Sequence, residues 1–196
     1  ERIETQEGDL TAEILQLDKL AKILRAERIR NGAITFDRSE VRFNLDENNK
    51  PIGVYFKVSK DSNHLIEEFM LLANRKVSEF VSLNKRKEPT GNTFIYRIHD
   101  DPDPAKLTAL RDFVGTFGYK MDLANTQTVA QSLNRLLSDV KGKGEENMIE
   151  TLAMRSMSKA VYSTNPIGHY GLGFEYYSHF TSPIRRYPDL IAHSLL

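Results

Sequence analysis

Apolar residues recur at intervals of three or four near the start of the chain, at Leu10, Ile14, Leu17, Leu20 and Leu24. This spacing places side chains on one face of an α-helix. Asn31 and Gly32 follow, and residues of these two types commonly end helices. The pattern therefore predicts an amphipathic helix that stops near residue 31.

Three short segments after this helix have the composition of β-strands: Ala33–Phe36, Val41–Leu45 and Ile52–Val58. The second alternates apolar and polar residues, which is the two-residue period of a half-buried strand. The polar turn Asp46–Pro51 separates it from the third. We therefore expect a small antiparallel meander.

Helices dominate the rest of the chain. We expect a long helix from residue 61 or 62 to about residue 85, a strand at Thr93–His99, and helices at Thr126–Val140 and Glu145–Val161. The long helix carries a broad apolar face, which indicates packing against a core. The predicted fold class is α+β, a helix-rich mixed domain with a small, mostly antiparallel sheet.

Composition narrows the classes of function. The 196 residues include 27 basic and 27 acidic side chains, so no global positive field marks a polyanion partner. The chain has no cysteine, which excludes disulfides and thiolate chemistry and fits a reducing cytoplasm. No apolar run approaches the roughly 18 residues of a membrane span. We expect a cytoplasmic globular protein with no membrane partner.

Arg185 and Arg186 form the clearest candidate site. Thr181 or Ser182 can cap a helix whose first position is Pro183. Two arginines in a first helical turn oppose the helix dipole unless an anion joins them, and guanidinium groups bind phosphate oxygens bidentately. The alternative is that they pair with surface carboxylates. A second proline, Pro188, leaves open a helix that restarts there.

Two further residues have both a structural and a binding interpretation. Glu67 lies early in its predicted helix, where an acid complements the dipole, or it accepts hydrogen bonds from a sugar or base. Phe36 ends a predicted strand, where it is either a core residue or a platform for a nucleobase. His99, Asp100 and Asp101 are metal-ligand types, but consecutive residues rarely converge on one ion, so a turn explains them better.

Three longer strings share a family resemblance. They are NHLIEEFMLLANRKV (Asn63–Val77), YRIHDDPDPAKL (Tyr96–Leu107) and HYGLGFEYYSHFTSPIRRYPDLIAH (His169–His193). Together they resemble the catalytic domain of the ribonuclease R/ribonuclease II family. Residues 31–51 and 153–163 match that pattern in order and spacing too, so the resemblance covers nearly the whole chain.

The resemblance implies a hydrolase that degrades single-stranded RNA processively from its 3′ end to nucleoside 5′-monophosphates, with Mg²⁺ as cofactor. By position, Arg185 matches the family's catalytic arginine, which holds the scissile phosphate. Phe36 matches an aromatic that stacks the terminal base, and Glu67 matches an acid that contacts the terminal nucleotide. Arg186 aligns beside the catalytic arginine, and we expect it to bind substrate as well.

The chain departs from the family in one respect. Family members hold their metals with a cluster of aspartates early in the catalytic domain, whereas only Asp9 and Asp18 precede Asn31 here. We therefore expect residues 1–196 to be a single partial catalytic domain without metal ligands or the flanking oligonucleotide-binding-fold domains. Such a fragment should be inactive alone, and apolar surface exposed by truncation should favour self-association.

Two other functions remain open. The first is a non-catalytic RNA-binding module, in which the same arginine and phenylalanine side chains bind RNA without chemistry. The second is a helical scaffold that uses the Leu10–Leu24 face to contact protein partners. An RNA affinity that depends on Arg185 would exclude the scaffold.

Overall fold

The computed structural model describes residues 2–36, 40–57 and 59–196, which divide into two compact units. Unit 1 comprises Glu1–Leu24 and Phe36–Phe69, and unit 2 comprises Arg25–Thr35 and Met70–Leu196. Both boundaries that fall inside regular structure lie within long helices, α2 (Thr11–Arg30) and α3 (Asp61–Ser82).

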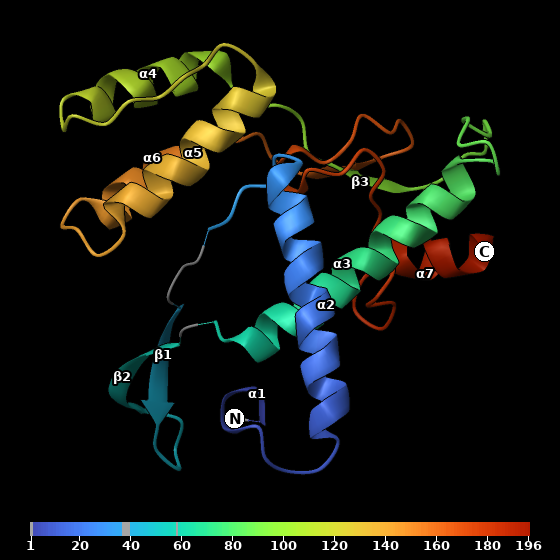
Figure 1. Ribbon diagram of the computed structural model, residues 1–196, viewed down its shortest axis with the longest axis horizontal. Coiled ribbons are helices and arrows are strands. Elements are labelled where there is room, and N and C mark those ends of the chain that lie inside the picture. Colours follow the sequence, from blue (N-terminus) through green and yellow to red (C-terminus); the bar gives the residue numbers. More distant parts are fainter. Residues whose placement is uncertain (1, 37–39, 58) are drawn as a thin grey trace. The chain divides into compact units, whose positions relative to one another are not determined.

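The described residues form helices and two antiparallel strand pairs, which confirms the α+β class (Figure 1). The elements are α1 (Arg2–Thr5), α2 (Thr11–Arg30), β1 (Glu40–Leu45), β2 (Pro51–Lys57), α3 (Asp61–Ser82), β3 (Tyr96–Ile98), α4 (Pro104–Gly115), α5 (Thr126–Val140), α6 (Glu146–Ser156), β4 (Val161–Ser163), the 3₁₀ turn η1 (Tyr170–Leu172) and α7 (Tyr187–Leu195). Within the described ranges, none of the helices is long and apolar enough to cross a membrane.

Unit 1 contains a hairpin of β1 and β2. Its turn is closed by the carboxylate of Asp46, which accepts the backbone N–H groups of Asn48 and Lys50 at 2.8 Å each. Asn49 adopts a positive φ of 61° in this turn, a conformation that asparagine tolerates better than most residues. Turn chemistry near residue 46 therefore sets the register of the two strands.

One face of this hairpin is apolar and open. Val41 lies opposite Phe56, and Phe43 lies opposite Val54, so all four side chains point to the same side of the pair. Each of the four is more than half exposed, with Phe56 at 67%. Neighbouring exposed apolar side chains of this kind mark contact surfaces.

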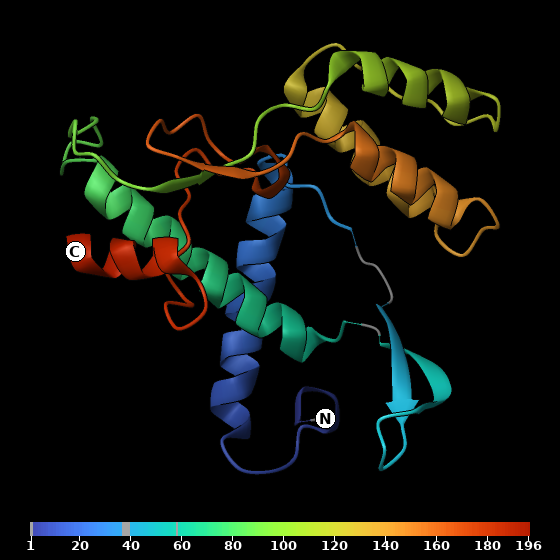
Figure 2. The same ribbon diagram turned by 180° about the vertical axis from the view of Figure 1, so that it is seen from behind.

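Unit 2 contains a layer of three helices. α4, α5 and α6 lie near one another in both views (Figures 1 and 2), and Val114, Leu133 and Ile149 between them have no exposed surface. Asn125 starts α5 with a capping box, in which its side chain and that of Thr128 each accept the other's backbone N–H. Cap and apolar face together explain why α5 spans the predicted residues.

A second apolar cluster in unit 2 joins β3 to α7. Phe94, Tyr96 and Ala192 are buried there, and Val77 and Val81 of α3 pack against them. The Tyr96 hydroxyl and the Ser82 hydroxyl share a hydrogen bond of 2.7 Å, which satisfies both inside the cluster. This cluster supports the segment between Tyr177 and Asp189 described below.

Two expectations about strands and helices are wrong. Residues 33–36 form no strand, because the backbone N–H of Ile34 is donated to the Gly171 carbonyl and that of Thr35 to the Asn134 side chain. The approach is close: a Cβ on Gly173, whose φ is 65°, would lie 2.9 Å from the Ala33 nitrogen. α6 ends at Ser156, and Val161 belongs instead to β4.

We predict that the 196-residue chain self-associates through the apolar hairpin face. Light scattering after size-exclusion chromatography should show a mass above 22.4 kDa that rises with concentration. Replacing Phe43 and Phe56 together by Ser should return the chain to the monomer mass, because it removes the two largest apolar groups from the face. Tyr55→Ser, on the opposite face, is the matched control. A wild-type monomer at every concentration would contradict the prediction.

Candidate nucleic-acid interface

The segment from Tyr177 to Thr181 follows an irregular path that one buried side chain organises. Asn74 of α3 is 3% exposed, and its Oδ1 accepts the backbone N–H groups of Phe180 and Thr181 at 3.0 and 3.2 Å. Its Nδ2 donates to the Tyr177 hydroxyl at 3.1 Å. A buried segment outside a sheet needs such partners for its polar groups. Asn74 therefore forms the hydrogen bonds that a neighbouring strand would form in a sheet.

A single helical turn follows, and it precedes α7 rather than opening it. The N–H groups of Arg185 and Arg186 are both donated to the Ser182 carbonyl, at 3.3 and 3.1 Å. The helix proper then begins at Tyr187 with Pro188 in its first turn. The expected helix start at Pro183 is therefore wrong, and the helix begins at Tyr187, one residue before the restart that Pro188 left open. Arg186 is extended at the N-cap position of α7, with φ −132° and ψ 113°, which separates the two segments.

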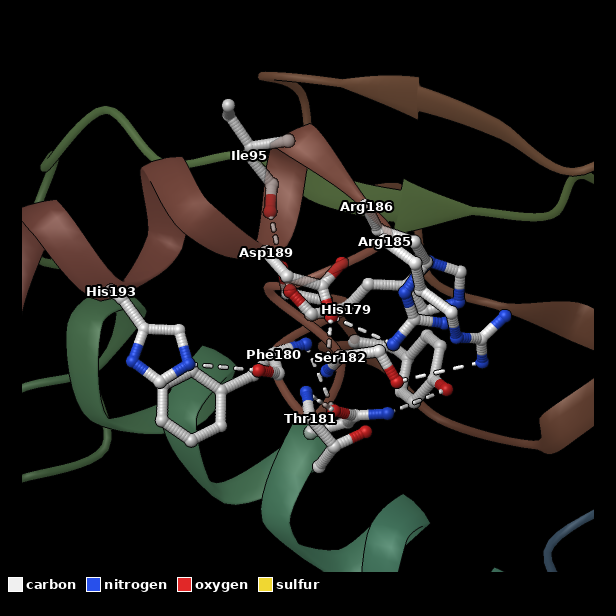
Figure 3. A network of polar contacts seen from close by, with 12 residues as sticks. Ile95, His179, Phe180, Thr181, Ser182, Arg185, Arg186, Asp189 and His193 are labelled. Carbon is white, nitrogen blue, oxygen red and sulfur yellow. Dashed lines mark hydrogen bonds and ion pairs between the residues drawn. The ribbon is translucent and has the colours of Figure 1, made fainter.

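Arg185 reaches solvent from this turn (Figure 3). Its guanidinium makes one hydrogen bond in the described structure, a long contact of 3.5 Å from Nη2 to the Ser182 hydroxyl. In the part of the chain that the structure describes, no carboxylate forms an ion pair with it. The alternative of a surface ion pair is therefore not supported for Arg185, and its guanidinium can accept an anion.

Arg186 has a different environment. Its Nη2 donates to Oδ2 of Asp189 at 2.7 Å, and Asp189 has no exposed surface. The same Oδ2 accepts the backbone N–H of Ser182 at 2.9 Å. Asp189 thus ties the start of the turn to its end. The structure gives Arg186 a role in holding the turn that bears Arg185.

A cation–π pair lies close to this turn in unit 2. Arg97 of β3 and Tyr162 of β4 are directly opposite in the antiparallel register, and the Arg97 Cζ lies 4.7 Å from the centre of the Tyr162 ring. The Tyr162 hydroxyl is 2.7 Å from Nδ1 of His179. Two segments that are far apart in the sequence therefore lie beside the turn that bears Arg185.

Positive charge surrounds His179. The pKa of His179 is lowered to about 4, first by burial and then by the charges of Arg186, Arg97 and Arg185, against an opposing effect of Asp189. The imidazole is accordingly neutral at physiological pH. The three arginines whose charges lower the pKa of His179 therefore lie near it.

Sequence reasoning missed Arg97, Tyr162 and His179 as members of this site. Arg97 and His179 lie inside the strings that carry the resemblance, but neither has a local pattern that marks a site. Only the pairing of β3 with β4 brings Arg97 to Tyr162. A prediction of a strand at residues 161–163 would have indicated this pairing. The helix predicted at Glu145–Val161 extended into that range instead.

The other two candidate residues belong to unit 1. Phe36 is partly buried and lies in a loop, not at the end of a strand. Glu67 is half exposed, and its carboxylate lies 3.5 Å from Nδ1 of His64. The structure brings Arg185 and Arg186 together, and it describes Phe36 and Glu67 separately from them.

Metal ligation does not fit the described residues. None of the His, Asp and Glu side chains in residues 2–36, 40–57 and 59–196 gather in threes in a metal-binding arrangement. Asp103, two residues beyond the His99–Asp101 motif, caps α4 by accepting the N–H groups of Ala105 and Lys106. A cavity of about 500 Å³ near His99 and His169 includes none of the four candidate residues.

The RNB-domain family model matches residues 1–196. The chain belongs to the RNB-domain family. Ribonuclease R of Aquifex aeolicus is 34% identical over 194 residues, which is 99% of this chain and 26% of that protein. The chain therefore spans about a quarter of the length of the curated relatives it matches.

Solved structures share the fold of this chain. The apo form of Mycoplasma genitalium RNase R matches with a TM-score of 0.85 and 30% identity over 99% of this chain and 30% of that one. The same enzyme in complex with ribose-methylated single-stranded RNA matches at 0.84 and 29% over the same shares. Yeast Ssd1, a pseudonuclease, matches at 0.66 and 21% over 95% of this chain and 23% of that one, which shows the fold alone.

We predict that Asp189→Asn destabilises this RNB-domain chain. Breaking a buried ion pair leaves Arg186 without charge compensation, at a cost of about 3–5 kcal/mol. Thermal or urea unfolding followed by circular dichroism measures the loss. Asp112→Asn is a matched control, because Asp112 pairs with Arg111 at the surface and exposed pairs contribute about 0–1 kcal/mol. Equal, small effects of both substitutions would contradict a structural role for Asp189.

Proposed function

We propose that this chain forms the phosphate-binding part of the catalytic region of a 3′→5′ exoribonuclease. The substrate is single-stranded RNA, which the longer enzyme degrades processively to nucleoside 5′-monophosphates. The family membership supports this reaction class, and the cysteine-free composition favours a cytoplasmic setting. The chain by itself is expected to bind RNA without hydrolysing it.

One observation carries the proposal: Arg185 is an exposed arginine on a turn that is fixed from inside the protein. Asn74 holds the preceding residues, and Asp189 holds Ser182 and Arg186. Orientation of a charged donor before substrate arrives avoids an entropic cost at binding. The turn therefore presents a guanidinium group in a defined position.

Arg185 suits the chemistry of a phosphodiester. Its planar guanidinium donates two parallel hydrogen bonds to a pair of phosphate oxygens, and it remains protonated throughout. As negative charge develops on the phosphate in the transition state, a fixed cation at this place stabilises it. We assign Arg185 the role of holding the scissile phosphate.

Phe36 and Glu67 supply the contacts to the nucleoside. A partly exposed phenylalanine stacks a nucleobase of any sequence, and stacking contributes about 1–3 kcal/mol per base. The half-exposed carboxylate of Glu67 can accept hydrogen bonds from ribose hydroxyl groups or from a base. Both assignments rest on the family resemblance.

Mg²⁺ is the cofactor of the proposed enzyme. The described residues do not form a carboxylate cage of the kind that Mg²⁺ requires, and we assign no ligand here. In the longer enzyme, the metal would supply an activated water and a counter-charge for the leaving oxygen. Arg185 performs its own role on the phosphate, and that role needs no metal.

The second candidate function is a non-catalytic RNA-binding module. The same observation favours it, because the exposed guanidinium of Arg185 binds a phosphate whether or not hydrolysis follows. Binding and cleavage therefore have to be measured on the same RNA.

We predict that Arg185→Ala weakens binding of single-stranded RNA. Loss of one phosphate contact should lower the affinity roughly tenfold and reduce the slope of log K against log salt by about 0.7. Retardation and shortening of a 5′-labelled RNA with Mg²⁺ give both readouts. Arg135→Ala serves as the control, because Arg135 is 82% exposed on α5 and pairs only with Asp139 in the described structure.

The outcomes separate the candidates. Binding without shortening, lost on Arg185→Ala, supports a phosphate clamp. Shortening from the 3′ end would contradict the expectation that the chain lacks metal ligands. Unchanged affinity in Arg185→Ala would refute the clamp itself.

We also predict that Phe36→Ala weakens RNA binding by about 1–3 kcal/mol, with little dependence on salt, because stacking is not ionic. Fluorescence anisotropy with an oligouridine measures the loss, and Phe36→Tyr should retain most of the affinity. A core role for Phe36 would instead lower the melting temperature of Phe36→Ala and leave the affinity of the folded fraction unchanged.

A further inference from the structure

The arginine-rich surface of unit 2 extends beyond the turn that carries Arg185. Arg97 lies on β3, more than eighty residues earlier in the sequence, and its guanidinium covers the ring of Tyr162 at 4.7 Å. Nothing in the family resemblance assigns a role to Arg97. Its place beside His179 and the turn nevertheless adds a third guanidinium to this part of the surface.

Arg97 has a fixed orientation. Its backbone N–H donates to the Tyr177 carbonyl at 2.9 Å, and β3 pairs it with Tyr162. The Tyr162 ring is held in turn by the 2.7 Å bond between its hydroxyl and Nδ1 of His179. An arginine held over an aromatic ring can still donate from its N–H groups to an acceptor.

The charges in this region do not balance. Among the residues that the structure describes, carboxylates form no ion pair with Arg97 or Arg185, while Asp189 is paired with Arg186. Three guanidinium groups therefore face one carboxylate, and each of the three acts on His179, which stays neutral. An excess of fixed positive charge at partly exposed positions is a binding site for a polyanion.

We propose that Arg97 is a second phosphate-binding residue, which holds another phosphodiester group of the same RNA strand that Arg185 holds. This inference rests on the proposed function. A polyanion is favoured over a single phosphate ion, because the two uncompensated arginines come from different segments, β3 and the turn before α7. A strand with one phosphate per nucleotide supplies an anion to each of them.

The position of Arg97 also determines which chemical group of the strand it can bind. One face of the Tyr162 ring is covered by the guanidinium, so Arg97 contacts the strand with its N–H edge. That edge matches the oxygens of a phosphate in two parallel bonds. The contact is therefore independent of base sequence.

The test is a salt titration of RNA affinity with charge-altering variants of the 196-residue chain. Arg97→Gln keeps most of the aliphatic stem and removes the charge, and Arg97→Lys keeps the charge. Fluorescence anisotropy with a labelled single-stranded RNA gives Kd at several salt concentrations, and melting temperatures are measured for each variant. Arg135→Gln on α5 is the matched control for the loss of an exposed arginine.

We expect Arg97→Gln to raise Kd roughly threefold or more at low salt and to reduce the slope of log K against log salt by about 0.7, with Arg97→Lys close to wild type. An unchanged slope in Arg97→Gln, with a slope change in Arg185→Ala, overturns this inference and leaves the proposed function standing. Unchanged slopes in both variants overturn both. A loss in Arg97→Gln that Arg97→Lys fails to restore, with a lowered melting temperature, assigns Arg97 to packing and also overturns the inference.

Discussion

The carboxylate of Asp189 is removed from solvent, and a buried charge is stable only where partners compensate its lost hydration. Arg186 and the backbone N–H of Ser182 provide that compensation. The requirement reaches beyond the pair, because both partners lie on the turn that bears Arg185. Satisfying one buried oxygen therefore fixes the backbone that presents the exposed guanidinium. The two adjacent arginines therefore differ in role, because Arg186 faces inward to the carboxylate and Arg185 faces outward.

Polar side chains perform a similar function throughout this part of unit 2. Asn74 satisfies two backbone N–H groups and one hydroxyl, and the hydroxyl of Ser178 donates to the Ile95 carbonyl. His193 lies at the other end of the network (Figure 3), where its ring stacks on Phe180 at 4.0 Å and Nε2 contacts the Phe180 carbonyl. Irregular backbone thereby obtains the hydrogen bonds that a sheet would otherwise supply.

Local signals in the sequence predicted α2, α3 and α5 well, extended α6 beyond its end at Ser156 and predicted the site incompletely. α5 was predicted over its observed residues, because an asparagine cap and a helical apolar face agree there. The strand expected at Ala33–Phe36 does not form, since its composition suits a strand but its hydrogen-bonding partners are Gly171 and Asn134. Arg185 was proposed as a candidate from its residue type and its neighbours. Arg97 was not, because its place in the site depends on strand pairing across more than sixty residues, and local spacing contains no information on such pairing.

In the proposed function Arg185 contacts only phosphate, and this would have a consequence for the movement of a strand past it. The four nucleotides differ in their bases but share the same backbone charge, so each advance by one nucleotide would present Arg185 with an identical partner. The free-energy profile for translocation over such a contact is periodic and nearly flat from step to step. A rigid turn with an outward guanidinium would suit a strand that moves past it repeatedly. No nucleotide would be bound much more tightly than the others at that contact.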